Sequence, residues 1–164
     1  MRFTQRTASQ GNQATSWRRG VSVVAMLAAL VSVTGCSAAM MVFGTGAKRP
    51  AITEFGLGPR SSANRLYSAT LEPTEALKPR RLQSVRITVV DSAGLPVEGA
   101  AMTIGGGMPQ HGHGLPTRPR MTRAIAAGTY QIEGVRFNMG GWWEFKVTIA
   151  TDRGEDTITF NLSL

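Results

Sequence analysis

Hydrophobic and polar residues alternate with a period of two in several short segments of this 164-residue chain. A period of two places successive side chains on opposite faces of a β-strand. In residues 84–90, for example, Val85, Ile87 and Val89 fall on one face and polar residues on the other. The same pattern occurs in residues 65–72, 100–104, 129–135, 142–150 and 156–164. No segment after residue 65 shows a convincing helical period, so the pattern predicts an all-β domain.

Turn signals separate the predicted strands. Residues 91–96 read Asp-Ser-Ala-Gly-Leu-Pro, and Asp152-Arg153-Gly154 interrupts the last two alternating segments. Glycine, proline and aspartate at such points favour tight turns between strands. Short strands that recur at intervals of roughly 10–20 residues, with turns between them, are typical of an antiparallel β-sandwich. We therefore predict one sandwich domain of six to seven strands over residues 65–164.

The N-terminus has the pattern of an export signal. Four arginines precede an apolar run over residues 21–33, which Val33-Thr34-Gly35-Cys36 follows. A basic region, an apolar region and small residues before a cut are typical of secretory signals. The last four residues resemble the lipobox of bacterial lipoproteins. We expect residues 1–35 to be a lipoprotein-type signal peptide and Cys36 to be lipidated.

An uncleaved membrane anchor is the alternative, because no charge occurs between Arg19 and Lys48 and this stretch is long enough to span a bilayer. Either form predicts an exported chain tethered to the membrane on its periplasmic side. The position of the only cysteine favours the lipoprotein. Ser37 would not act as an inner-membrane retention signal, which favours the outer membrane. Residues 36–64, without an apolar period, are expected to form a flexible tether.

Charge changes this picture little. The formal net charge is +8, but four of the eighteen cationic residues and none of the ten acids lie in the first 35 residues. The remaining cations are scattered, and no nucleic-acid recognition motif is present. We expect no nucleic-acid partner. Lipidation of Cys36 would leave the mature chain without a free thiol.

Residues 105–119 carry the candidate chemistry. They are rich in glycine and proline and contain both histidines of the chain, His111 and His113. In an extended segment this spacing sends both imidazoles to the same side. Met108 lies three residues upstream, and Met139 is positioned to reach the same end of a sandwich. Because imidazole suits copper and thioether sulfur selects Cu(I), we expect a copper site with the two histidines as primary ligands and the two methionines as supplementary ones.

A competing hypothesis makes the chain a non-catalytic interaction or scaffold module of the envelope. The histidines would then hold the long loop in shape through hydrogen bonds, and the methionines would fill the core. Of the pair Trp142-Trp143, one indole is expected to face inward. The other, that of Trp142, would face outward and contact a partner.

Enzymatic motifs are missing from the sequence. It contains no G-x-S-x-G, H-E-x-x-H or P-loop motif. The acids of the second half of the chain fall on predicted strand exteriors or turns, and no base is paired with a nucleophile. We expect a protein that is not an enzyme.

The ordered combination of Gly94-Leu95-Pro96-Val97, Met108-Pro109-x-His111-x-His113 and Met139-Gly140-x-Trp142 resembles the YtkA/FixH-like family of small exported domains. The similarity covers about residues 65–164. It implies an immunoglobulin-like β-sandwich. The FixH branch is associated with cation-pump and cytochrome oxidase assembly, which implies copper supply and a copper-receiving envelope protein as partner. FixH proteins typically carry a transmembrane helix, whereas this chain has a lipoprotein-type signal.

Overall fold

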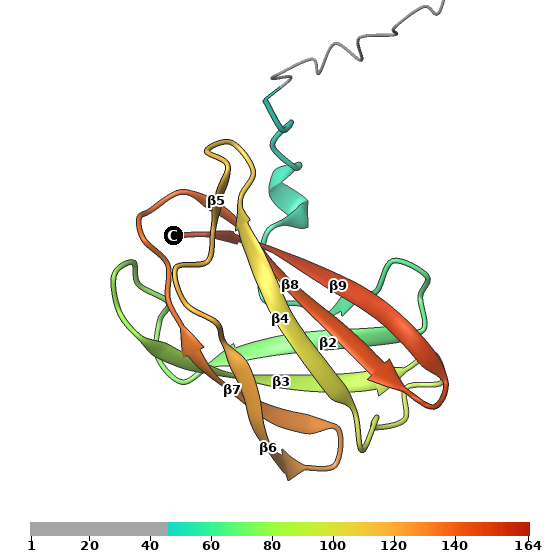
Figure 1. The fold of residues 1–164 in the computed structure, drawn as a ribbon. Coiled ribbons are helices and arrows are strands. Elements are labelled where there is room, and N and C mark those ends of the chain that lie inside the picture. The colour runs from blue at the N-terminus through green and yellow to red at the C-terminus, as the bar shows by residue number, and fades with distance from the viewer. Residues whose placement is uncertain (1–45) are drawn as a thin grey trace, which may run out of the picture. The chain divides into compact units, whose positions relative to one another are not determined.

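A computed structural model describes residues 46–164 of the chain (Figure 1). The predicted signal peptide, the predicted lipidation site Cys36 and the first part of the predicted tether lie outside the described residues. In the described part, no helix is long and apolar enough to cross a membrane.

Two antiparallel sheets form a β-sandwich, as the alternating pattern predicted (Figure 1). The five-stranded sheet has the order β1-β2-β3-β7-β6, and the four-stranded sheet has the order β5-β4-β8-β9. The strands are β1 (Arg60–Ser61), β2 (Tyr67–Pro73), β3 (Gln83–Asp91), β4 (Ala101–Met108), β5 (His113–Gly114), β6 (Arg120–Ala126), β7 (Thr129–Val135), β8 (Trp142–Thr151) and β9 (Gly154–Ser163), and a short 3-10 helix, η1, spans Ile52–Glu54. Seven of these strands have seven or more residues, in agreement with the expected number, and β1 and β5 have two each.

The core lies between the sheets and is built from the apolar face of each predicted strand. Ile87, Ile132 and Phe160 are fully buried, as are the inward residues of β8 from Trp143 to Ile149. Phe137, in the β7–β8 loop, packs edge-on against Trp143 with ring centres 5.2 Å apart. Burial of this apolar surface is the main stabilising contribution to the fold.

Two features of the sheets differ from the sequence prediction. Strand β6 was not predicted, because it is an exposed edge strand whose residues alternate little in burial. Strand β4 continues through Gly105–Gly107 to Met108, where we expected a loop. Glycine permits this continuation, because a Cβ atom on Gly106 would overlap the carbonyl oxygen of Glu144 in the neighbouring strand.

Part of the segment expected to be a tether is hydrogen-bonded to the sandwich. The amide of Gly56 donates to Asn161 in β9 at 2.9 Å, and the amide of Leu71 in β2 donates to Leu57 at 2.6 Å. Strand β1 then pairs with β2. Residues 55–61 therefore connect the edge strand of one sheet to the other sheet, and the folded domain begins before residue 65.

The loops gather at two ends of the sandwich (Figure 1). Arg80 donates its amide to Phe137, and Gly141 donates its amide to Leu164, so the β2–β3 loop, the β7–β8 loop and the C-terminus share one end. We call this the histidine end; its loops are residues 46–59, 74–82, 109–112, 115–119 and 136–141. The connections β3–β4, β6–β7 and β8–β9 lie at the opposite end.

Candidate functional site

The two histidines lie on a hairpin formed by β4 and β5. The carbonyl oxygen of Met108 accepts hydrogen bonds from the amides of His111 and Gly112, each at 3.0 Å. Gly112 has a φ of 65°, which glycine adopts without steric cost. His113 then pairs with Met108 across the hairpin. The tight turn is thus set by the backbone, and it presents both imidazoles at the edge of the four-stranded sheet.

The imidazoles lie face to face. Their ring centres are 6.1 Å apart and their planes differ by 8°. Both side chains are exposed, and among residues 46–164 neither ring takes part in a hydrogen bond. Both rings therefore lie on the same side of the hairpin, as predicted. The hydrogen bonds to carbonyl groups required by a structural role of the histidines are not found within these residues.

Met108 differs from its expected setting. It is the last residue of β4, its side chain is 3% exposed, and it belongs to the core. The methyl group of Met108 lies 2.9 Å from the position that a Cβ atom of Gly141 would occupy. The expectation that Met108 lies in an open loop is therefore wrong, and its role as a ligand stays a prediction.

Met139 lies on the β7–β8 loop at the histidine end, as expected, and its side chain is 41% exposed. Its carbonyl oxygen accepts a hydrogen bond of 3.0 Å from the Trp143 indole. The contact between Met108 and Gly141 joins this loop to the base of the histidine hairpin. The thioether of Met139 is thus on an exposed neighbouring loop, and its role as a ligand stays a prediction.

Trp142 is not exposed, contrary to expectation. Its side chain is 3% exposed, and its indole N–H donates to Asn161 Oδ1 at 2.9 Å. Asn161 is also hydrogen-bonded to residues 54 and 56. The N-terminal segment, which the sequence pattern did not assign to the domain, is therefore anchored beside the indole. A contact between Trp142 and a partner stays a prediction.

Glu144 lies beside the histidine hairpin, although its sequence pattern marks it only as an outward strand residue. A shallow hollow of about 270 Å³ is lined by Gly107, Gly114, His113 and Glu144. The Glu144 carboxylate is 2.8 Å from the Lys146 ammonium group. Its outward place on β8 was predictable, but its proximity to the hairpin depends on the pairing of Gly107 with Glu144 across the sheet. Among residues 46–164, no three His, Cys, Asp or Glu side chains form a cluster that could hold a metal ion.

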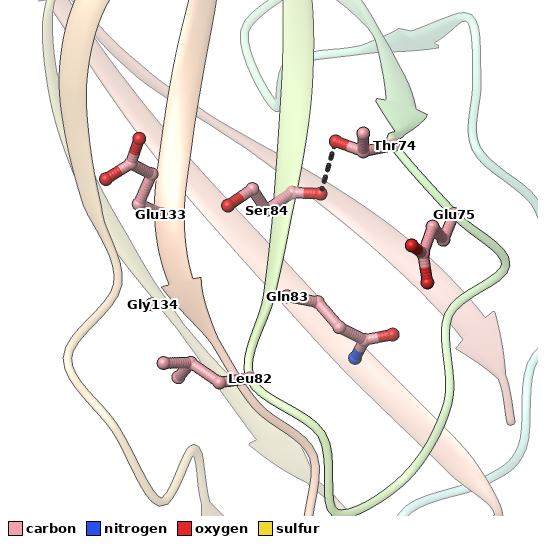
Figure 2. Close-up of a pocket in the computed structure, with 7 residues that line it drawn as sticks. All are labelled: Thr74, Glu75, Leu82, Gln83, Ser84, Glu133 and Gly134. Carbon is pink, nitrogen blue, oxygen red and sulfur yellow. Dashed lines mark hydrogen bonds between the residues drawn. The ribbon is translucent and has the colours of Figure 1, made fainter.

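A second hollow of about 380 Å³ lies beside the five-stranded sheet, where the β2–β3 loop meets β3 and β7 (Figure 2). Glu133 of β7 lies on one side, and Thr74 and Glu75 of the β2–β3 loop lie on the other. The Thr74 hydroxyl donates to the carbonyl oxygen of Ser84 at 3.2 Å. No nucleophile is paired with a base among the residues that line it.

Two buried carboxylates have a structural role. The carboxylate of Asp91 accepts hydrogen bonds from the amides of Leu95 and Ala93 and from Arg153. The bond from Leu95 and the Arg153 side chain hold the pKa of Asp91 below its ordinary value, against the effect of burial. Both carboxylates lie at the end opposite the histidines, because the second, Asp156, lies close to the β8–β9 turn.

Comparison with known proteins identifies the family. The model of the YtkA-like family matches residues 62–148, which include the histidine hairpin, the β7–β8 loop and most of β8. The chain belongs to the YtkA-like family. This confirms the resemblance noted in the sequence. The YtkA-like family is not a known enzyme family. Neither the curated proteins nor the solved structures contain a match to this chain.

Proposed function

We propose that this YtkA-like protein is a membrane-tethered, non-catalytic protein of the cell envelope that binds copper through His111 and His113. The observation that carries the proposal is the closeness of the two exposed imidazoles on one side of the hairpin, with ring centres 6.1 Å apart. Two imidazoles that bind one ion through bonds of about 2 Å would have their ring centres about 5–6 Å apart. The nitrogen lone pairs of parallel rings do not meet at one point, so the exposed imidazoles would rotate about their side-chain torsions to bind a single ion on the same backbone.

The type of donor favours copper. Imidazole nitrogen binds copper and zinc, and thioether sulfur prefers Cu(I). Met139 is the exposed thioether on the adjacent loop, and Met108 would contribute only if its side chain left the core. A bound ion would give the chain the ability to buffer copper or to pass it to a copper-receiving envelope protein. Lipidation of Cys36, with the outer membrane as destination, completes this proposal.

A soluble form of residues 46–164 is suited to the test, because it holds every strand and the whole core described above. Cu(I) and Cu(II) would be titrated in competition with a chelator, with Zn(II) for comparison. We expect one copper ion per chain and its loss in the double variant His111→Ala/His113→Ala. Gln110→Ala, an exposed change in the same turn, should bind copper as the parent does.

Two outcomes would contradict the proposal. One is equal copper affinity in the parent and the double histidine variant. The other is tighter binding of zinc than of copper by the parent. If the double variant instead unfolds more easily and no metal binds to the parent, the histidines are structural and the interaction module becomes the better hypothesis.

A further inference from the structure

We propose that the histidine end of the domain docks on the surface of an anionic phospholipid membrane. The surface is centred on a loop that the proposed copper site does not use, and the inference does not depend on copper binding. Charge is distributed unevenly between the two ends. The loops of the histidine end hold seven of the fourteen Lys and Arg residues among residues 46–164, but only two of the ten acids. The loops of the opposite end, residues 62–66, 92–100, 127–128 and 152–153, hold two cations, Arg65 and Arg153, and two acids, Glu98 and Asp152.

The centre of the proposed surface is the segment of residues 78–82, which we call the basic loop. Lys78, Arg80, Arg81 and Leu82 are all exposed, and the side chain of Leu82 is 70% exposed. Cations beside an exposed leucine suit an anionic interface, because the cations attract lipid phosphates while the apolar side chain enters the headgroup region.

The basic loop is held in shape before any partner binds. The Gln83 side chain accepts a hydrogen bond from the Lys78 amide at 2.7 Å and donates one to the Lys78 carbonyl oxygen at 2.9 Å. The Arg80 amide donates to the Phe137 carbonyl oxygen at 2.7 Å. Because these bonds use the backbone and Gln83, the cationic side chains are available to an external surface. A preorganised loop loses less conformational entropy on binding.

The N-terminal segment continues the same surface. Lys48, Arg49 and Ile52 are exposed, and the side chain of Ile52 is 81% exposed. The chain also enters the domain at this end, at Gly46 (Figure 1). Nine residues lie between Cys36 and Gly46, so a lipidated Cys36 would keep this end within about 35 Å of the bilayer. Such a short tether turns docking into an intramolecular event, in which weak attraction suffices.

The membrane, rather than a protein, is the occupant that these features favour. The apolar segment 21–33 and the uncharged stretch before Lys48 direct the preceding chain to a bilayer. The exposed apolar side chains of the surface, Ile52, Leu57, Leu82 and Met139, are separate and interspersed with cations. A protein partner usually covers a contiguous apolar patch, whereas cations next to exposed apolar side chains match the phosphates and the headgroup region of an anionic bilayer. The tether in this proposal is the N-terminal anchor of the proposed function.

Sedimentation with vesicles tests the proposal directly. Residues 46–164, which lack the tether, would be mixed with vesicles of phosphatidylcholine alone or of an equimolar mixture with phosphatidylglycerol. We expect binding to the mixed vesicles only, and weaker binding at high salt because ions screen the attraction. The variants Lys78→Glu/Arg81→Glu and Leu82→Ser should weaken binding, the first by about tenfold or more.

Matched controls distinguish the effect of the basic loop on vesicle binding from the effect of the net charge of the domain. Arg65→Glu/Arg123→Glu makes the same change in net charge away from the histidine end, and Leu95→Ser removes a leucine that is 59% exposed at the opposite end. Both controls should bind mixed vesicles nearly as the parent does. Three results would overturn the proposal. One is that the parent fails to bind mixed vesicles, and another is that it binds neutral vesicles equally well. The third is an equal loss of vesicle binding in the variants and in their controls. Because copper is absent from this assay, its result is independent of the proposed metal site.

Discussion

The methyl group of Met108 occupies the space beside Gly141, 2.9 Å from where a Cβ atom of that glycine would lie. Gly141 also has a φ of 126°, which residues with a side chain rarely adopt. This contact joins the base of the histidine hairpin to the β7–β8 loop. It explains why a methionine that the sequence placed in an open loop belongs to the core.

Gly141→Ala should lower the free energy of unfolding by about 1–3 kcal/mol, because alanine is strained at this φ. The flexible end of Met108 can move aside, so we attribute most of the loss to the backbone. Urea unfolding of residues 46–164 measures it. Gly105→Ala is the control, since a Cβ atom at Gly105 meets no atom within 4 Å. A similar loss in both variants would refute this explanation.

Gly107→Ala should disrupt the pairing of β4 with β5. A Cβ atom at Gly107 would overlap the carbonyl oxygen of His113, and neither backbone can move without breaking the hairpin. We expect a loss of about 1–3 kcal/mol in unfolding free energy, as for other overpacked sites. If the proposed copper site is correct, copper affinity should fall as well. Normal copper affinity in a well-folded variant would show that the hairpin geometry is not required.

Acid should destabilise the domain through Asp91 and Asp156. Burial raises the pKa of Asp156, but the Ser62 hydroxyl and the amides of Thr157, Asn64 and Leu66 lower it by more. Both carboxyls therefore have a folded pKa below their ordinary value of 3.8. Their stabilising contribution is present above that value and is lost as the pH falls through the folded pKa.

Urea unfolding as a function of pH checks this sign. The parent should have a level free energy of unfolding above the ordinary carboxyl pKa and a decline below it. Asp156→Asn should be less stable than the parent at neutral pH and should show a shallower decline in acid. A parent whose stability rises as the pH falls through this range would contradict the assignment.

Removal of residues 46–64 should destabilise the sandwich. The deletion removes β1 and the hydrogen bonds of Gly56 to Asn161 and of Leu71 to Leu57. Each bond contributes about 0.5–1.5 kcal/mol, so the total loss should be a few kcal/mol, and the indole of Trp142 should become more exposed. Urea unfolding and tryptophan fluorescence measure these effects. Removal of residues 46–50 alone, which precede η1, serves as the control and should change stability little.

The sequence alone determined the position of each strand that has one face packed on the core and the other exposed. Alternation in residues 84–90 and 142–150 identified the buried faces of β3 and β8, because one face of each sheet packs on the core and the other is polar. It also located the turn at Asp91, whose carboxylate binds the amides of Ala93 and Leu95. The histidine pair was equally visible, because a two-residue spacing on an extended chain suffices to align two side chains.

Only the tertiary structure decided which outer positions are covered. Trp142 alternates outward yet is buried, because its indole binds Asn161 beside the N-terminal segment. Strands β1 and β5 have two residues each, too few to show a period, and β6 is an edge strand with little contrast between its faces. Local pattern records the alternation of side chains along one strand. Burial on the outer face depends on segments distant in sequence, and no local pattern encodes where they pack.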